Sequence, residues 1–76
     1  MILNPQDDPN AAREAEKYDR PVVSREFLLD ALARHEGPMT LNRLISDLGY
    51  DGDEELIEGL RRRLRAMERD GQIIRN

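Results

Sequence analysis

Helix-stopping residues divide most of this sequence into short segments. The stops lie at Gly37 and Pro38, at Gly49, and at Asp70 and Gly71. At such positions glycine takes a left-handed conformation and proline cannot continue a helix. No apolar run between the stops approaches the roughly 20 residues that a membrane span needs. The chain therefore has to build its interior from short amphipathic helices, and we expect no membrane association.

Before each of the three stops lies one segment with a helical pattern of apolar residues. Each of these three segments begins with a residue that is suited to cap a helix. Ser24, Thr40 and either Asp51 or Asp53 precede the first apolar residues of the three segments, and their side chains can accept a hydrogen bond from the first turn. Apolar residues then recur at helical spacing and share one face of each segment. They are Phe27, Leu28, Ala31 and Leu32 in the first segment, Leu41, Leu44, Ile45 and Leu48 in the second, and Leu56, Ile57, Leu60, Leu64 and Met67 in the third. These residues form the predicted core.

The sequence before Ser24 is less regular. Residues 1–10 contain two Pro, two Asp and two Asn and predict a flexible lead. Residues 11–18 have high helix propensity and follow Asn10, which is a good helix cap, but they include few large apolar side chains, so we expect this short helix to dock weakly. We therefore divide the chain into a flexible lead (1–10), a short N-terminal helix (11–18) and one domain (19–76).

The order of the elements predicts a mainly α fold with a three-helix core. Met39 and residues 72–75 are expected to form short β segments. Helix, short strand, helix, short turn, helix, strand is the order of a winged helix-turn-helix domain. A wing also needs a second strand, and the sequence ends at Asn76 before one. We therefore expect a truncated wing, and a chain that is a piece of a longer protein.

Charge is distributed unevenly along the chain. The formal net charge of −4 by itself argues against a nucleic-acid partner. However, residues 1–58 carry 6 basic and 14 acidic side chains, a net of −8, whereas residues 59–76 carry 6 basic and 2 acidic side chains, a net of +4. The location of charge matters more than its sum. The basic end of an acidic chain is thus compatible with a nucleic-acid-binding surface.

Five arginines of the third predicted helix are the candidate nucleic-acid-binding residues. On a helical wheel Arg62, Arg65 and Arg69 lie opposite the apolar stripe, and Arg61 lies to one side. Arg63 lies near the core edge, where its stem can pack while its guanidinium reaches solvent. The planar guanidinium suits phosphate, and the last helix of a winged-helix domain commonly presents its outer face to nucleic acid.

A plain solvated helix face is the competing interpretation of these arginines. Glu58 lies three and four residues before Arg61 and Arg62, which is the spacing of ordinary surface ion pairs. Against this interpretation, only Glu68 and Asp70 are acidic between positions 59 and 71. The positive surplus is therefore not paired locally.

Two other functions remain open on the pattern alone. The helix and strand order also fits a DNA-binding module of a transcriptional regulator. The acidic stretch over residues 14–58 fits the docking surface of a protein-interaction module. Comparing duplex DNA with duplex RNA at equal salt separates the first alternative from an RNA-binding module.

Catalytic and metal-binding motifs are not evident in the sequence. The chain has no Cys, which excludes disulfides and thiolate metal sites. His35 has no identifiable catalytic partner, and the acidic residues over 51–58 lack the order of a calcium loop. A domain of 76 residues also buries too little surface for a deep catalytic cavity. We expect no catalytic residue, metal or cofactor in this chain.

Three stretches of the sequence carry a specific resemblance to a known family. They read AREAEKY over 12–18, PVVSREFL over 21–28 and EGLRRRLRAMERDGQ over 58–72. Together they resemble the N-terminal segment of bacterial ribonuclease R, and the likeness covers about residues 11–75. It implies a winged-helix domain that precedes cold-shock-like RNA-binding domains, a catalytic domain and an S1 domain in a longer chain.

The resemblance also implies a function. Ribonuclease R is a processive, magnesium-dependent 3′→5′ exoribonuclease of the cytoplasm that degrades structured RNA, and its terminal regions are linked to duplex unwinding and substrate choice. The catalytic Asp cluster and its magnesium belong to the central domain, so neither is carried onto this chain. What is carried over is the basic helix with Arg61, Arg62, Arg63, Arg65 and Arg69. We thus expect a monomeric, cytoplasmic, accessory module that binds structured or tailed duplex RNA.

Overall fold

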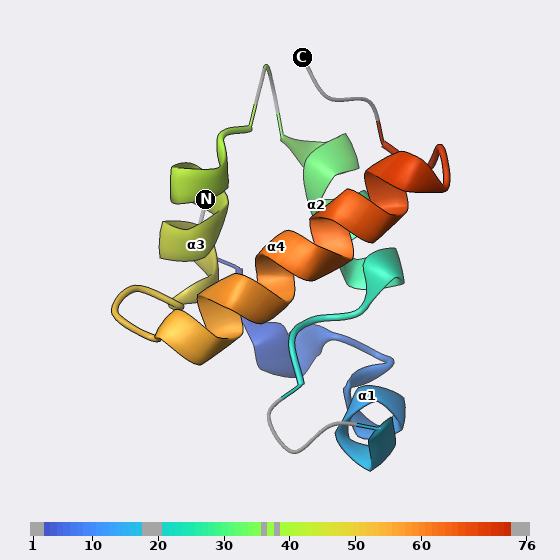
Figure 1. Ribbon diagram of the computed structural model, residues 1–76, viewed down its shortest axis with the longest axis vertical. Helices are drawn as coiled ribbons and strands as arrows, with labels where there is room; N and C mark the ends of the chain where they lie inside the picture. Colours follow the sequence, from blue (N-terminus) through green and yellow to red (C-terminus); the bar gives the residue numbers. More distant parts are fainter. Residues whose placement is uncertain (1–2, 18–20, 36, 38, 74–76) are drawn as a thin grey trace.

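The computed structural model describes residues 3–17, 21–35, 37 and 39–73. A short 3₁₀ helix, η1 (Pro5–Asp7), is followed by α1 (Ala11–Lys17), α2 (Arg25–Arg34), α3 (Leu41–Leu48) and α4 (Glu54–Arg69). In Figure 1, α4 runs diagonally across the view with α2 and α3 on its far side, and α1 lies at the lower end. This arrangement confirms the predicted mainly α architecture with a three-helix core. Among the described helices, none is long and apolar enough to cross a bilayer.

The helix boundaries follow the predicted caps. The side chains of Ser24, Thr40 and Asp53 each accept a hydrogen bond from the backbone N–H three positions further on, at 3.2, 3.1 and 3.2 Å. Asp53, and not Asp51, is thus the cap of α4. Gly49 ends α3 with φ of 75°, a left-handed conformation that glycine adopts without steric cost.

One hydrophobic core joins the helices to the extended segment before α2. Its buried members are Val22, Val23, Leu28, Leu44, Ile45, Leu48, Tyr50, Leu60 and Met67. As predicted, α4 turns Leu60 and Met67 inward, and both are fully buried. The predicted core did not include Val22, Val23 or Tyr50. A Cβ at position 59 would lie 3.0 Å from Val22 Cγ1, so the glycine there allows α4 to approach the segment before α2 closely.

The end of α2 lies earlier than the sequence predicted. The helix stops at Arg34, and the backbone N–H of His35 closes it with a hydrogen bond to the Ala31 carbonyl at 3.2 Å. Gly37 has φ of 81° but lies in the loop beyond the cap, and Pro38 lies outside the described residues. Gly37 is therefore a turn residue, and the predicted cap at this position was wrong.

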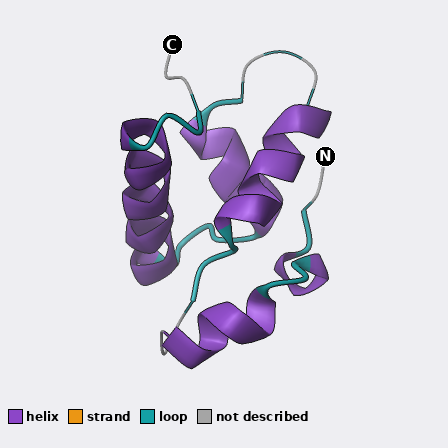
Figure 2. Cartoon of the chain, turned by 90° about the vertical axis from the view of Figure 1, so that its right-hand side faces the viewer, coloured by secondary structure: helices purple, strands orange, loops and turns teal. Residues whose placement is uncertain are grey.

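The predicted β segments are not found in the described part of the chain (Figure 2). Met39 has no regular structure, so the strand predicted there was wrong, and Gln72 and Ile73 form a bend after α4. The rest of the strand predicted over 72–75 lies outside the described residues. A strand needs a hydrogen-bonded neighbour to be stable. Met39 and Ile73 instead pack half-buried against the hydrophobic core.

Residues 3–17 form what we call the N-terminal strap, which crosses one end of the three-helix core (Figure 2). The sequence predicted a flexible lead and a weakly docked helix here. In the structure the Leu3 N–H donates to the Asp47 carbonyl at 2.8 Å and the side chains of Asp8 and Glu14 are buried, while the flexibility of the lead stays a prediction. Because these anchors are polar, the apolar pattern of the sequence gave no sign of them.

Candidate nucleic-acid interface

Arginine side chains of α4 form an exposed cationic surface, which we call the arginine face. It consists of Arg61, Arg62, Arg65 and Arg69. The side chains of Arg62, Arg65 and Arg69 are 74%, 69% and 76% exposed, and Arg61 is exposed as well. Their direction follows from the helix register, because α4 buries Leu60 and Met67 and the opposite side must face solvent. The predicted orientation of these four residues is confirmed.

Two carboxylates form ion pairs with the arginine face, and a third, Glu68, is exposed on the same stretch of α4, so four arginines face three acids. Glu58 Oε1 lies 3.6 Å from Arg62 Nε and 3.5 Å from Arg65 Nη2, so one acid is shared by two guanidinium groups. Asp70 Oδ1 lies 3.6 Å from Arg69 Nε. Exposed pairs of this kind contribute about 0–1 kcal/mol, so a phosphate can displace them readily.

Arg61 adds a further positive charge to the arginine face. Within the described part of the chain it forms no ion pair. It also lines an open hollow of about 490 Å³ between α3 and the first half of α4, together with Ile45, Ile57 and Glu58. The hollow therefore adjoins the arginine face at Arg61.

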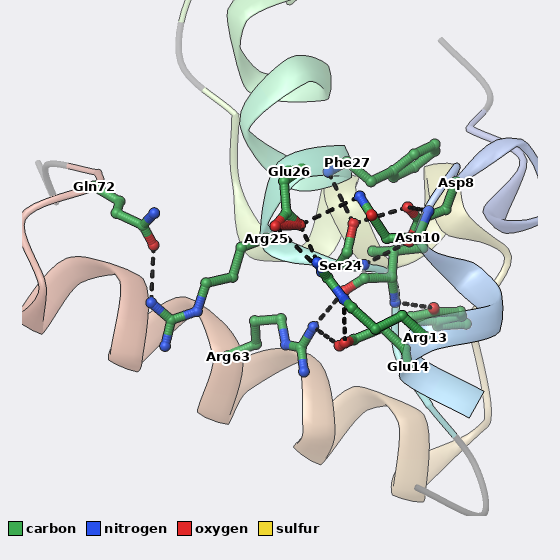
Figure 3. Close-up of polar contacts among 12 residues, drawn as sticks. Asp8, Asn10, Arg13, Glu14, Ser24, Arg25, Glu26, Phe27, Arg63 and Gln72 are labelled. Carbon is green, nitrogen blue, oxygen red and sulfur yellow. Dashed lines mark hydrogen bonds and ion pairs between the residues drawn. The ribbon is translucent and has the colours of Figure 1, made fainter. Parts of the chain in front are cut away.

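Arg25 connects the start of α2 to the end of α4. Its Nη1 donates to Asp70 Oδ2 at 2.8 Å. The same atom donates to Gln72 Oε1 at 3.0 Å (Figure 3). The hydrogen bond from Arg25 and the nearby charge of Arg69 lower the pKa of Asp70 below its ordinary value. A single negative charge is thus shared by Arg25 and Arg69, which leaves a positive surplus at this end of the face. The sequence prediction missed Arg25, because its partners lie 45 and 47 residues away.

Arg63 is set apart from the arginine face. Its side chain is only 14% exposed, and its Nη1 donates to Glu14 Oε1 of α1 and to the Val23 carbonyl, the latter at 3.2 Å (Figure 3). The predicted position at the core edge is confirmed. The guanidinium, however, faces the buried carboxylate of Glu14 in α1 and not solvent. Whether Arg63 binds RNA stays a prediction.

Asp8 lies at the N-terminal end of α2, where it fastens the strap. Its carboxylate accepts hydrogen bonds from the Ser24 N–H at 2.6 Å, the Ser24 hydroxyl at 2.8 Å and the Asn10 N–H at 2.9 Å. Burial favours a higher pKa for Asp8, but these hydrogen bonds and the charge of Arg13 outweigh it, and the pKa is lowered. The ionised carboxylate also complements the positive end of the helix dipole.

The pKa of Asp8 leads to a pH-dependent prediction. A carboxylate whose pKa is lowered by folding stabilises the domain above its unfolded pKa of about 3.9, and this stabilisation is lost as the pH falls through the folded value. Asp8→Asn is therefore expected to cost about 1–3 kcal/mol at pH 7 and much less near pH 3. Thermal melts of both proteins at the two pH values measure the difference. Asp7→Asn, an exposed neighbour with the same charge change, is the control, and a pH-independent gap for Asp8→Asn would contradict the assignment.

Acidic side chains of the described residues do not gather into a metal site. No group of three or more His, Cys, Asp or Glu side chains in that part of the chain is placed to hold a metal ion. The surface that the structure does build is cationic and suited to binding anions.

Comparisons with known proteins identify the relatives of this chain. Residues 26–76 match the family model of the ribonuclease R winged-helix domain. The chain is 55% identical over 67 residues to ribonuclease R of Escherichia coli K12, and the match covers 88% of this chain and 8% of that protein. For ribonuclease R of Acidithiobacillus ferrooxidans the identity is 54% over 69 residues, with 91% and 15% covered. For Vibrio parahaemolyticus it is 51% over 74 residues, with 97% and 9% covered.

The matched region is a small part of each relative. The chain spans between 8% and 15% of the length of these three curated proteins. No solved structure matches the chain. The likeness thus concerns one domain and does not extend to the rest of the longer proteins.

Proposed function

The chain belongs to the ribonuclease R winged-helix domain family, and on that basis we propose that it is a nucleic-acid-binding accessory domain of a ribonuclease R-type 3′→5′ exoribonuclease. It contacts structured RNA through Arg61, Arg62, Arg65 and Arg69, mainly by arginine–phosphate interactions. The observation that carries this proposal is the surplus of exposed arginines in the C-terminal part of α4, where residues 61–69 present Arg61, Arg62, Arg65 and Arg69 and only one exposed acid, Glu68.

In this proposal, catalysis belongs to the longer protein. A magnesium-dependent catalytic domain, outside the residues described here, hydrolyses the RNA in the cytoplasm. The winged-helix domain holds the structured part of the substrate and assists its engagement or unwinding. The assignment rests on family membership.

The geometry of duplex RNA limits how α4 can bind. Arg62, Arg65 and Arg69 are spread over about 10 Å along the helix axis at 1.5 Å per residue, which allows contact with a few neighbouring phosphates. The major groove of A-form RNA is too deep and narrow for side chains to read. Contact is therefore expected with the backbone, across the minor groove or at a junction between duplex and single strand. Stacking contributes little, because α4 carries no aromatic residue.

Arginine–phosphate contact predicts weak, salt-sensitive binding. Three or four such contacts give a slope of roughly −2 to −4 when the logarithm of the association constant is plotted against the logarithm of the salt concentration. The expected dissociation constants are about 10⁻⁴ to 10⁻⁶ M. An NMR titration of the isotope-labelled protein with a tailed RNA duplex at two salt concentrations measures both, and the largest shifts are expected over residues 61–69.

The same titration with duplex DNA at equal salt tests the main alternative. Preferential, sequence-dependent binding to DNA would replace the proposal with a transcriptional DNA-binding module. RNA-induced shifts confined to other helices would leave the arginine face without the proposed role, and an absence of shifts with either nucleic acid would favour a protein-interaction module.

A further inference from the structure

The N-terminal strap withholds one arginine from the surface that α4 presents to solvent. Arg63 follows Arg62 directly in α4, yet its guanidinium is held by Glu14 of α1, whose side chain is only 5% exposed. The proposed function uses the four exposed arginines and leaves this contact unexplained. Glu14 and the Val23 carbonyl together hold the guanidinium of Arg63 at the flank of α4.

The strap is attached mainly by polar contacts. Leu3 is its one described hydrophobic residue that packs against the core, and this residue is only half-buried. Its polar anchors include the Leu3 N–H hydrogen bond to the Asp47 carbonyl, the Asp8 hydrogen bonds to Ser24, the contact of Glu14 with Arg63, and an exposed ion pair between Arg13 and Glu26 at 3.0 Å (Figure 3). Segments with few buried apolar contacts open more readily than the rest of a domain. A buried ion pair adds little to closure, because desolvation offsets much of the attraction.

We propose that the N-terminal strap is a releasable clasp that regulates the arginine face. While the strap is closed, Glu14 holds Arg63 away from RNA. When the strap lifts, Arg63 becomes available as an additional phosphate contact, and a segment with a net charge of −2 moves away from α4. The inference rests on the proposed function, since it concerns the same helix and the same ligand.

Two substitutions at position 14 release Arg63 in different ways. Glu14→Gln removes the charge of the partner, whereas Glu14→Asp keeps the charge but shortens its reach. Each is expected to bind the tailed RNA duplex about 2- to 5-fold more tightly and to steepen the salt slope by about 0.7–0.9. Because Glu14→Asp leaves the net charge unchanged, a gain in that variant cannot come from lowered overall repulsion. Circular dichroism measures whether each variant is folded. If Glu14→Gln does not fold, Glu14→Asp still provides the test.

A double substitution identifies the residue responsible. Adding Arg63→Gln to either variant is expected to cancel the gain in affinity. Asp30→Asn, which breaks an exposed pair with Arg34 on α2, is the charge-matched control and is expected to leave binding nearly unchanged. When the unaltered chain binds RNA, the clasp is overturned if neither variant binds more tightly, if the gain persists with Arg63→Gln, or if Asp30→Asn gives the same gain.

A second measurement does not depend on RNA. The side-chain N–H groups of Arg63 should exchange with solvent faster in both position-14 variants than in the unaltered chain, as observed by NMR. If no protein in the series binds RNA, the proposed function fails, but faster exchange at Arg63 still supports the release of the clasp. Unchanged exchange overturns the clasp irrespective of the binding result.

Discussion

Replacing Arg62, Arg65 and Arg69 together with glutamate is expected to abolish RNA binding and to leave the domain folded. All three side chains project from the exposed side of α4. The substitutions remove three phosphate contacts and take the formal net charge from −4 to −10. Because such contacts supply essentially all of non-specific binding, the dissociation constant is expected to rise above about 1 mM. An NMR or fluorescence titration with the tailed RNA duplex measures the loss.

The chain offers a closely matched control for this reversal. Arg65 and Arg34 are 69% and 70% exposed, and each lies beside one carboxylate, at 3.5 Å from Glu58 and 3.0 Å from Asp30. Arg65→Glu and Arg34→Glu therefore change the charge equally at equally exposed sites on different helices. Only Arg65→Glu should weaken binding clearly. Equal losses in the two variants would mean that net charge, and not the arginine face, determines affinity.

The thermal stability of the triple variant shows whether a loss of RNA binding comes from lost arginine–phosphate contacts or from unfolding of the domain. Surface substitutions of this kind usually change stability by less than about 0.5 kcal/mol each. Acidic side chains in the last turn of α4 oppose the helix dipole slightly. The triple variant should therefore melt within a few degrees of the unaltered chain. A collapsed melting transition would attribute the binding loss to unfolding and would contradict the placement of these residues on the surface.

Local patterns explain why much of the fold was predictable from the sequence. The caps at Ser24, Thr40 and Asp53 depend on residues three positions apart, and the inward direction of Leu60 and Met67 depends on the helical repeat. Each signal lies within a single helix. The arginine face was predictable for the same reason, because it is the complement of the apolar stripe.

Contacts between distant residues explain what was missed. Arg63 and Glu14 are 49 residues apart, and Arg25 and Asp70 are 45 apart. A charged residue gives no sign in the sequence of which distant charge it pairs with. The apolar pattern also could not reveal a strap that is fastened by Asp8 and Glu14. The strand predicted at Met39 was wrong because a strand needs a hydrogen-bonded neighbour, and the sequence does not show whether one is present. In the structure Met39 packs against the hydrophobic core instead.

One helix therefore serves both the interior and the proposed interface. A rotation of α4 by half a turn would bury the arginines and expose the apolar stripe, so the direction of one side fixes the direction of the other. The orientation of the arginine face is consequently tested by any measurement that reports how deeply Leu60 is buried.

Leu60→Ala is expected to destabilise the domain by about 2–5 kcal/mol. The side chain is fully buried, and removing it loses apolar burial and leaves a cavity. At roughly 0.05–0.15 kcal/mol per residue, the whole chain has a stability of only about 4–11 kcal/mol. The melting temperature should thus fall by at least about 10 °C, which thermal denaturation followed by circular dichroism measures directly.

Arg61→Ala provides the neighbouring control, because residue 61 is exposed on the same helix. It should change stability by less than about 0.5 kcal/mol while weakening RNA binding, the opposite of what a buried position would give. If Leu60→Ala melted like the unaltered chain and Arg61→Ala did not, α4 would be turned the other way. The arginine face would then point inward, and the physical basis of RNA binding by this helix would be lost together with the predicted core.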